Sequence, residues 1–210
     1  MSLAPVLARG IEQLGLEVAP EIQHKLTLFL ALLQKWNKVY NLTAIRDPQQ
    51  MVSHHLLDSL AVLPYLESGR WLDVGCGAGL PGLVLALSRP QMSFTLIDSN
   101  SKKTSFVQQA LIELGITNVS VHCVRVEEWQ PLERFDVIIS RAFAETAQFI
   151  ECSRHLLQER GHWIAMKRKP DQELTRLPPD IKVDRLIELH VPGIDAARCL
   201  VILHEERRPG

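Results

Sequence analysis

The sequence contains the glycine-rich stretch DVGCGAGLPG at residues 73–82, at the end of a short apolar run that begins with Trp71. Glycines at such a position let the backbone turn tightly and let a ligand approach without a Cβ in the way. The apolar residues 83–87 that follow indicate a helix, whose first turn offers free N–H groups and a positive dipole end. The strand, glycine turn and helix together predict a cofactor-binding loop.

Apolar runs and helical segments alternate on the carboxyl side of this loop, which predicts an α/β fold with a mostly parallel sheet and helices on both faces. We expect strands at 71–74, 93–97, 119–123, 135–139 and 163–166, and helices at 83–87, 102–114 and 146–157. Two further β-rich runs, 181–189 and 199–203, are separated by Pro192-Gly193 with no room for a crossover helix. They predict an antiparallel pair at the edge of the sheet.

The first third of the chain is predicted to be helical. One apolar stripe with three- and four-residue spacing indicates a helix; its members are Ile22, Leu26, Phe29, Leu30, Leu33, Trp36 and Tyr40. Asp47, before Pro48, is a candidate cap for another helix. We therefore expect an N-terminal helical extension at 1–67, packed on a cofactor-binding core at 68–210.

The composition excludes several classes of protein. No apolar run approaches the roughly 18 residues of a membrane span, and no signal-peptide pattern is visible, so we expect a cytoplasmic protein. None of the four cysteines lies in C-x-x-C spacing, so we expect no metal site. The net charge is −1, and the charge balance alone therefore gives no support for nucleic-acid binding. Any affinity for RNA must come from local basic clusters.

The glycine stretch by itself fits two kinds of cofactor. Residues 77–82 match the dinucleotide fingerprint G-x-G-x-x-G, and Asp98 lies about 20 residues downstream, where it would serve the ribose of either cofactor. Gly75 directly after the strand and an acidic Asp73 at the strand end favour a methyltransferase. A nicotinamide-dependent oxidoreductase and a purely structural glycine turn are the alternatives.

Several stretches that occur in order along the chain carry a more specific signal. They are Trp36-Asn37-Lys38 with Tyr40–Thr43, HLLDS at 55–59, the glycine stretch, LIDS at 96–99, RVEE at 125–128, SRAF at 140–143 and Met166-Lys167. This ordered set resembles the bacterial small-subunit rRNA guanine-N7 methyltransferases, the glucose-inhibited division protein B family. The chain departs from that pattern where Arg168 follows Lys167 in place of the usual glycine, where Ala78 replaces a frequent proline, and where Cys199 follows Arg198 in place of histidine.

The resemblance implies a Rossmann-like class I methyltransferase that uses S-adenosylmethionine to methylate N7 of a guanine in 16S rRNA, in the loop near the decoding centre. Its partner would be 16S rRNA in the small ribosomal subunit or in an assembly intermediate. The enzyme would act as a monomer, without a metal and away from membranes. A class I methyltransferase with another substrate and a non-catalytic RNA- or nucleotide-binding module are the alternatives.

The resemblance also implies the cofactor-binding residues. Gly75 and Leu80 would line the pocket, Asp98 would accept hydrogen bonds from the ribose hydroxyls, and Val126 and Glu127 would border the adenine. These positions fall at carboxyl ends of parallel strands, where open α/β sheets place their ligands. The full predicted set is Asp73, Gly75, Gly77, Gly79, Leu80, Asp98, Val126, Glu127 and Arg141.

On the substrate side, N7 of guanine carries a free lone pair and no proton, so its methylation needs alignment rather than a general base. We accordingly predict no certain catalytic base and expect Arg141, Asn41 and His55 to position the reactants. A turn-forming role is the alternative for Asn41. For His55, pocket lining and a structural role are both open, and Asp58 lies within i, i+3 reach.

Four residues are predicted to contact RNA. Phe143, together with Arg141, is a candidate to stack on the target base, and plain core packing is the alternative for Phe143. Lys167, Arg168 and Lys169 form the strongest basic cluster of the sequence and follow a strand end. We expect this cluster to contact phosphates; a solvated loop is the alternative.

Overall fold

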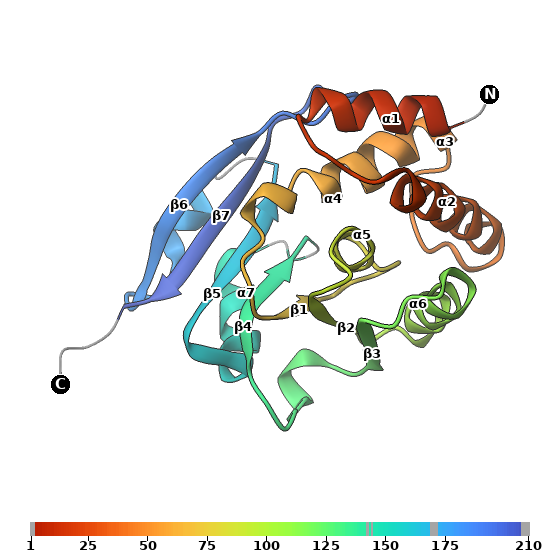
Figure 1. Cartoon of the computed structure of the whole chain (residues 1–210). Coiled ribbons are helices and arrows are strands. Elements are labelled where there is room, and N and C mark those ends of the chain that lie inside the picture. The colour runs from red at the N-terminus through yellow and green to blue at the C-terminus, as the bar shows by residue number, and fades with distance from the viewer. Residues whose placement is uncertain (1–2, 142, 144, 169–171, 207–210) are drawn as a thin grey trace.

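The computed structural model describes residues 3–141, 143, 145–168 and 172–206. Their centre is a seven-stranded sheet in the order β3-β2-β1-β4-β5-β7-β6 (Figure 1). The strands are β1 (Arg70–Val74), β2 (Ser93–Asp98), β3 (Val119–Cys123), β4 (Phe135–Ser140), β5 (Leu157–Lys167), β6 (Ile181–Leu189) and β7 (Arg198–Glu205). The first five run parallel, and β7 and β6 are antiparallel at the edge opposite β3. The predicted α/β fold and its antiparallel edge pair are confirmed.

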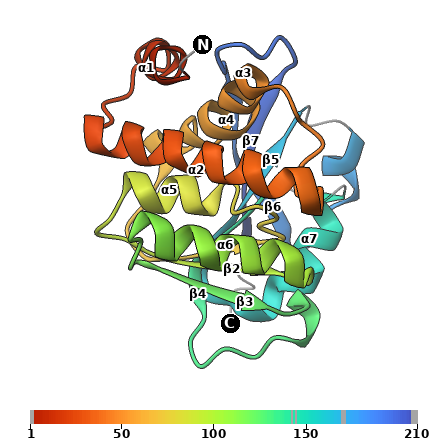
Figure 2. The same ribbon diagram turned by 90° about the vertical axis from the view of Figure 1, so that its right-hand side faces the viewer.

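Helices cover both faces of the parallel part because both faces of its central strands are apolar. Along β1, Trp71 belongs to one core cluster and Leu72 to the other, as the alternation of a strand requires. The helices α2 (Pro20–Tyr40), α5 (Gly82–Ser88) and α6 (Ser101–Leu114) lie together on one face (Figure 2). The other face is covered by α7 (Thr146–Ser153), through Phe149 and Ile150.

The helical N-terminal region contains more elements than the sequence predicts. The helix α2 matches the apolar stripe, and Asp47 caps α3 (Pro48–Met51) by accepting a hydrogen bond from Gln50 N at 2.8 Å, as expected. The helix α3 continues into a π-helix (Val52–Leu57) and α4 (Asp58–Leu60). A further helix, α1 (Ala4–Gln13), was not predicted.

The boundary between α7 and β5 differs from the prediction. The helix expected at 146–157 ends at Ser153, a 3₁₀ turn follows at Arg154–Leu156, and β5 begins already at Leu157. Ser153 is fully buried, and its hydroxyl donates to Phe149 O at 2.6 Å while accepting from Trp163 Nε1 at 3.0 Å. This buried bond joins the helix end to the strand, an interaction that local propensity does not encode.

None of the helices in the described ranges is both long and apolar enough to cross a lipid bilayer.

Candidate functional site

The glycine loop after β1 is held by the next strand of the sheet. Gly75 N and Cys76 N both donate to Ile97 O, at 2.9 and 3.0 Å. Gly75, Gly77 and Gly79 all have left-handed backbones, with φ of 69°, 57° and 81°. Three such residues within five positions explain why the loop is glycine-rich, since side chains with a Cβ are disfavoured there.

Asp98, the last residue of β2, fixes the loop from the other side. Its Oδ2 accepts from Gly77 N at 2.9 Å, and its Oδ1 accepts from Asn100 N at 2.8 Å. Lys103 Nζ lies 3.9 Å from Oδ2. These contacts fix the orientation of the carboxylate and leave lone pairs on its oxygens for further donors.

A cavity of about 320 Å³ opens beside Asp98, at the carboxyl ends of β1, β2 and β3, and Phe143 from the segment after β4 also lines it. Of the predicted cofactor residues, Gly75, Asp98, Val126 and Glu127 line it. The others lie elsewhere: Gly77 and Gly79 belong to the loop, Leu80 and Asp73 are buried beneath it, and Arg141 lines a second cavity. An oriented carboxylate beside apolar Ile97 and Val126 matches a nucleoside, with its ribose hydroxyls and flat base.

Asp73 lies under the glycine loop and is almost completely buried. Its Oδ2 accepts from Gly82 N at 2.8 Å, while its Oδ1 is buried without a hydrogen-bond partner among the described residues. Burial raises the pKa of this carboxyl to about 7, partly opposed by the Gly82 hydrogen bond and by the charge of Arg141. An orphaned carboxylate oxygen at this position fits a site that receives a cationic or hydrogen-bonding group.

Asp73→Asn is expected to stabilise the protein at alkaline pH. The pKa of Asp73 in the folded protein lies above its unfolded value of about 3.9, so the free energy of unfolding falls as the pH rises between these two values. The destabilisation caused by the buried charge is fully present above pH 7. The amide still accepts from Gly82 N and has no charge to bury, so we expect a gain of about 1–3 kcal/mol at pH 8 that vanishes near pH 4. Urea unfolding of both proteins at several pH values measures this difference. A variant less stable than wild type at pH 8 would contradict it.

Gly82→Ala is expected to destabilise the same region. A Cβ at this position would lie 2.7 Å from Asp73 Oδ2 and 3.0 Å from Leu96 Cδ1, both in the closed core. Crowding of this kind costs about 1–3 kcal/mol. Thermal unfolding followed by circular dichroism measures the expected drop in melting temperature. An unchanged melting temperature would show that Asp73 and Leu96 can shift to accommodate the Cβ without a loss of stability.

A second cavity, of about 330 Å³, lies on the other side of the end of β4. It is lined by loop residues Thr43–Ile45, by the π-helix and by the ends of β5 and β7. Arg141 lines this cavity, whereas Phe143, two residues later, lines the first. The two cavities thus flank one short segment after β4, which is the arrangement that a donor and an acceptor of a transferred group require.

Asp58 connects three segments in the wall of the second cavity. Its Oδ2 lies 3.3 Å from Arg141 Nη1, and its Oδ1 accepts from Arg198 Nε at 3.2 Å. Arg141 Nη1 also donates to His54 O at 3.0 Å. Asp58 is buried, so the two guanidinium groups offset its desolvation and are in turn fixed in position by it.

His55 is buried in the same wall and is neutral at physiological pH. Burial, followed by the charge of Arg141, lowers its pKa to about 4. Its Nε2 lies 2.9 Å from Thr43 Oγ1, while Nδ1 has no partner among the described residues. The i, i+3 neighbour Asp58 is engaged by the arginines instead. A neutral imidazole with one free nitrogen can accept or donate a hydrogen bond to a substrate.

Asn41 has the geometry of a turn residue. It follows α2 in the left-handed conformation, with φ of 51°, and its Oδ1 accepts from Arg46 Nη2 at 3.0 Å. It lines neither of the two cavities. Its role in closing the substrate side remains a prediction.

Three of the four predicted RNA contacts line the two cavities. The ring of Phe143 packs on Phe149 with centroids 5.4 Å apart, and its other side lines the first cavity. Lys167 and Arg168 line the second cavity, and Lys167 Nζ donates to Phe143 O at 3.1 Å. Lys169 lies outside the described residues.

Sequence reasoning did not include Arg198 and Thr43 in the site. Arg198 begins β7, and the antiparallel pairing of β7 with β5 places it beside Lys167 and Cys199 at the mouth of the second cavity. Both residues belong to stretches compared with the family pattern, Tyr40–Thr43 and the departure after Arg198, but the sequence alone assigns neither of them a role.

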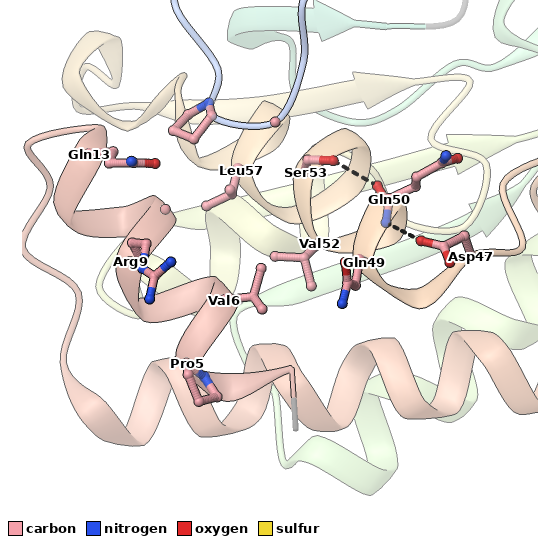
Figure 3. A pocket seen from close by; sticks show the side chains of 13 residues that line it. Pro5, Val6, Arg9, Gln13, Asp47, Gln49, Gln50, Val52, Ser53 and Leu57 are labelled. Carbon is pink, nitrogen blue, oxygen red and sulfur yellow. Dashed lines mark hydrogen bonds between the residues drawn. The ribbon is translucent and has the colours of Figure 1, made fainter. Parts of the chain in front are cut away.

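A larger cavity, of about 530 Å³, lies away from this site (Figure 3). It is enclosed by α1, by the outer side of α3 and the π-helix, and by Pro192-Gly193 of the β6–β7 loop. Figure 3 shows Arg9 and Gln13 of α1 opposite Ser53 and Gln50. No residue from the end of a parallel strand lines it, so we place the functional site at the two smaller cavities.

Among the described residues, no cluster of three or more histidine, cysteine or acidic side chains is arranged to hold a metal ion.

Comparisons with known proteins find similarity along nearly the whole chain. The family model of rRNA small subunit methyltransferase G matches residues 22–201. Ribosomal RNA small subunit methyltransferase G of Laribacter hongkongensis is 51% identical over 204 residues, which cover 97% of this chain and 99% of the relative. The protein of the same name from Methylobacillus flagellatus is 53% identical over 198 residues, covering 94% and 96%.

Solved structures of methyltransferases share the fold. The N-methyltransferase NodS of Bradyrhizobium japonicum, in complex with S-adenosyl-L-homocysteine, superimposes with a TM-score of 0.59 at 15% identity, over 83% of this chain and 100% of that one. TrmN of Thermus thermophilus gives 0.57 at 15% identity, over 73% and 53%. The sheet is therefore of the class I methyltransferase type, as predicted.

Proposed function

The chain belongs to the rRNA small subunit methyltransferase G family, and on that premise we propose that it transfers a methyl group from S-adenosylmethionine to N7 of a guanine in 16S rRNA, in the loop near the decoding centre. The observation that carries the proposal is the pair of cavities on either side of the segment after β4. One has the features of a nucleoside site, and the other has arginines and a neutral histidine in its wall.

The first cavity is proposed to hold the cofactor. S-adenosylmethionine supplies a methyl group that is already electrophilic because it is bonded to a sulfonium. Asp98 would accept from the ribose hydroxyls, Val126 and Glu127 would border the adenine, and Gly75 would allow close approach of the backbone. The orphaned Oδ1 of Asp73 lies beneath the same loop and would orient the loop-side end of the cofactor.

The second cavity is proposed to hold the guanine. An unprotonated N7 needs no base, and the described residues of this cavity offer only weak candidates for one: burial lowers the pKa of His55 to about 4, and Asp58 is paired with two arginines. Arg141 and Arg198 present planar cations that can stack on a base or hydrogen bond to its O6 edge. These residues would fix the orientation of the base, which is the main contribution such a reaction needs.

The remaining proposals concern the setting of the reaction. We place residues 1–67 as an extension that completes the substrate side, because Thr43 and the π-helix wall the second cavity. The substrate would be the small subunit or an assembly intermediate, and the enzyme would act as a monomer in the cytoplasm, where ribosomes are assembled.

Methyl transfer from labelled S-adenosylmethionine to purified small subunits tests the proposal directly. The subunits come from a strain that lacks the gene for this chain, and naked 16S rRNA and assembly intermediates serve as parallel substrates. Label at N7 of one guanine, located by mass spectrometry, is the expected result. Label on another molecule would identify a different substrate, and calorimetry that showed NAD binding in preference to S-adenosylhomocysteine would overturn the cofactor.

A further inference from the structure

Another cavity, of about 310 Å³, lies between the last turns of α2 and the start of α3, and we call it the α2–α3 cavity. It is lined by Gln34, Asn37, Lys38, Arg46, Pro48 and Met51. Figure 2 shows the chain leaving the end of α2 and returning to α3, which makes these residues neighbours. Nothing in the proposed reaction uses this cavity.

Two cations of the cavity are free of carboxylates in the described part of the chain. Lys38 and Arg46 are exposed and form no ion pair with any described residue. Arg46 donates one hydrogen bond, to Asn41 Oδ1, which orients its guanidinium and leaves its other donors available. In a chain with a net charge of −1, an unneutralised pair of this kind is a local feature that favours an anion.

An independent observation comes from Gln34. Its amide Nε2 is buried and donates to no acceptor among the described residues. A buried donor without an acceptor is costly and rare in proteins unless a ligand or water completes it. The cavity thus combines two positive charges with an unused neutral donor, which together match an anion with several acceptor oxygens.

The cavity is coupled to the substrate side by a single loop. Asn37, in its wall, accepts from Thr43 N at 2.9 Å, and Thr43 in turn contacts His55 at 2.9 Å in the second cavity. Thr43–Ile45 line the second cavity, and Arg46 lines the α2–α3 cavity. A strand whose base entered the second cavity would therefore continue across this loop toward Lys38 and Arg46.

We infer that this cavity binds a backbone phosphate of the RNA strand that flanks the methylated guanine, through Lys38, Arg46 and the Gln34 amide. The inference rests on the proposed function, because it takes the nucleotide in the second cavity as its starting point. Tyr40 supports a nucleic-acid partner: the residue is 43% exposed, and its ring packs at a tilt against Trp36, with centroids 5.3 Å apart. Cations beside an exposed aromatic ring are typical of surfaces that bind single-stranded RNA.

Lys38→Ala and Gln34→Met test the subsite in the complete protein. Each is expected to raise KM for small subunits lacking the modification by about fivefold to tenfold, with kcat nearly unchanged. For Lys38→Ala, the slope of log KM against log salt is expected to become shallower by about 0.7–0.9, as one phosphate contact is lost. Lys38→Arg is expected to restore both. Gln34→Met removes only an unpaired buried amide, so its melting temperature is expected to stay the same or rise.

Arg160→Ala is the matched control, because Arg160 is an exposed cation near the amino end of β5, at the opposite end of the sheet. Calorimetry with S-adenosylhomocysteine checks that every variant keeps its cofactor site. If wild type methylates the subunits and Lys38→Ala behaves like Arg160→Ala, the subsite is wrong and the proposed function stands. A raised KM with an unchanged salt slope would indicate a ribosomal protein in place of a phosphate and would also overturn it. If the wild-type enzyme leaves the subunits unmethylated, the proposed function is wrong, and the inference that the subsite binds RNA is wrong with it.

Discussion

Arg141→Ala is expected to lose at least about 100-fold in kcat/KM for small subunits, the loss typical of a reactant held out of line. Arg141 Nη1 donates to His54 O and pairs with Asp58, so the guanidinium is fixed at the boundary between the two cavities. Its removal takes away one of the two planar cations that Asp58 fixes in the wall of the second cavity, and Arg198 keeps its own position on the other oxygen of Asp58. It also leaves Asp58 with Arg198 as its single guanidinium partner among the described residues.

Arg141→Lys separates charge from shape. Lysine keeps the positive charge but lacks the rigid fork, and it cannot donate to His54 O and Asp58 while facing a base. We expect Arg141→Lys to remain at least about tenfold impaired, with S-adenosylhomocysteine affinity within a few-fold of wild type for both variants. Steady-state methylation assays and calorimetry measure the two quantities. Activity of Arg141→Ala within threefold of wild type would exclude the proposed role.

The cofactor half of the site was accessible to sequence reasoning because its parts are local. A glycine turn directly after a strand fixes where the loop lies, and the rule that parallel strands end at one rim brings Asp98 and Val126 to it without knowledge of the packing. Likewise, Asp47 is a cap residue whose chemistry is readable in isolation, and it caps α3 as expected. The individual roles of Asp98 and Val126 toward a cofactor remain predictions.

The substrate half depends on contacts between distant residues. Asp58 and Arg198 are 140 positions apart, and their pairing follows from the register of β7 on β5, which no local pattern specifies. The missed helix α1 has a similar cause. A Cβ added at Gly10 would lie 2.3 Å from Leu57 Cδ1, so the glycine lets α1 approach the π-helix closely. The same glycine lowers the helix propensity of the segment, which hides α1 from sequence reasoning.

Asp98→Ala is expected to weaken S-adenosylhomocysteine binding by about 100-fold, or roughly 2.7 kcal/mol. Two effects add. The variant loses a charged acceptor for the ribose hydroxyls, and hydrogen bonds to charged groups are each worth about 1.5–3 kcal/mol. It also releases Gly77 N and Asn100 N, which Asp98 holds at 2.9 and 2.8 Å, so the loop that shapes the cavity loses its anchor.

Asp98→Asn is expected to be nearly as damaging, although it keeps the size of the side chain. Both carboxylate oxygens already accept from backbone N–H groups, so an amide must turn its NH₂ toward either Gly77 N or Asn100 N and set donor against donor. Glu128→Gln is the matched control, since Glu128 is an exposed acid on the neighbouring 3₁₀ turn and does not line the cavity. Calorimetry on the three variants distinguishes the local requirement for the Asp98 carboxylate from a general effect of negative charge. Asp98→Asn with wild-type affinity would mean that the cofactor binds somewhere other than this rim.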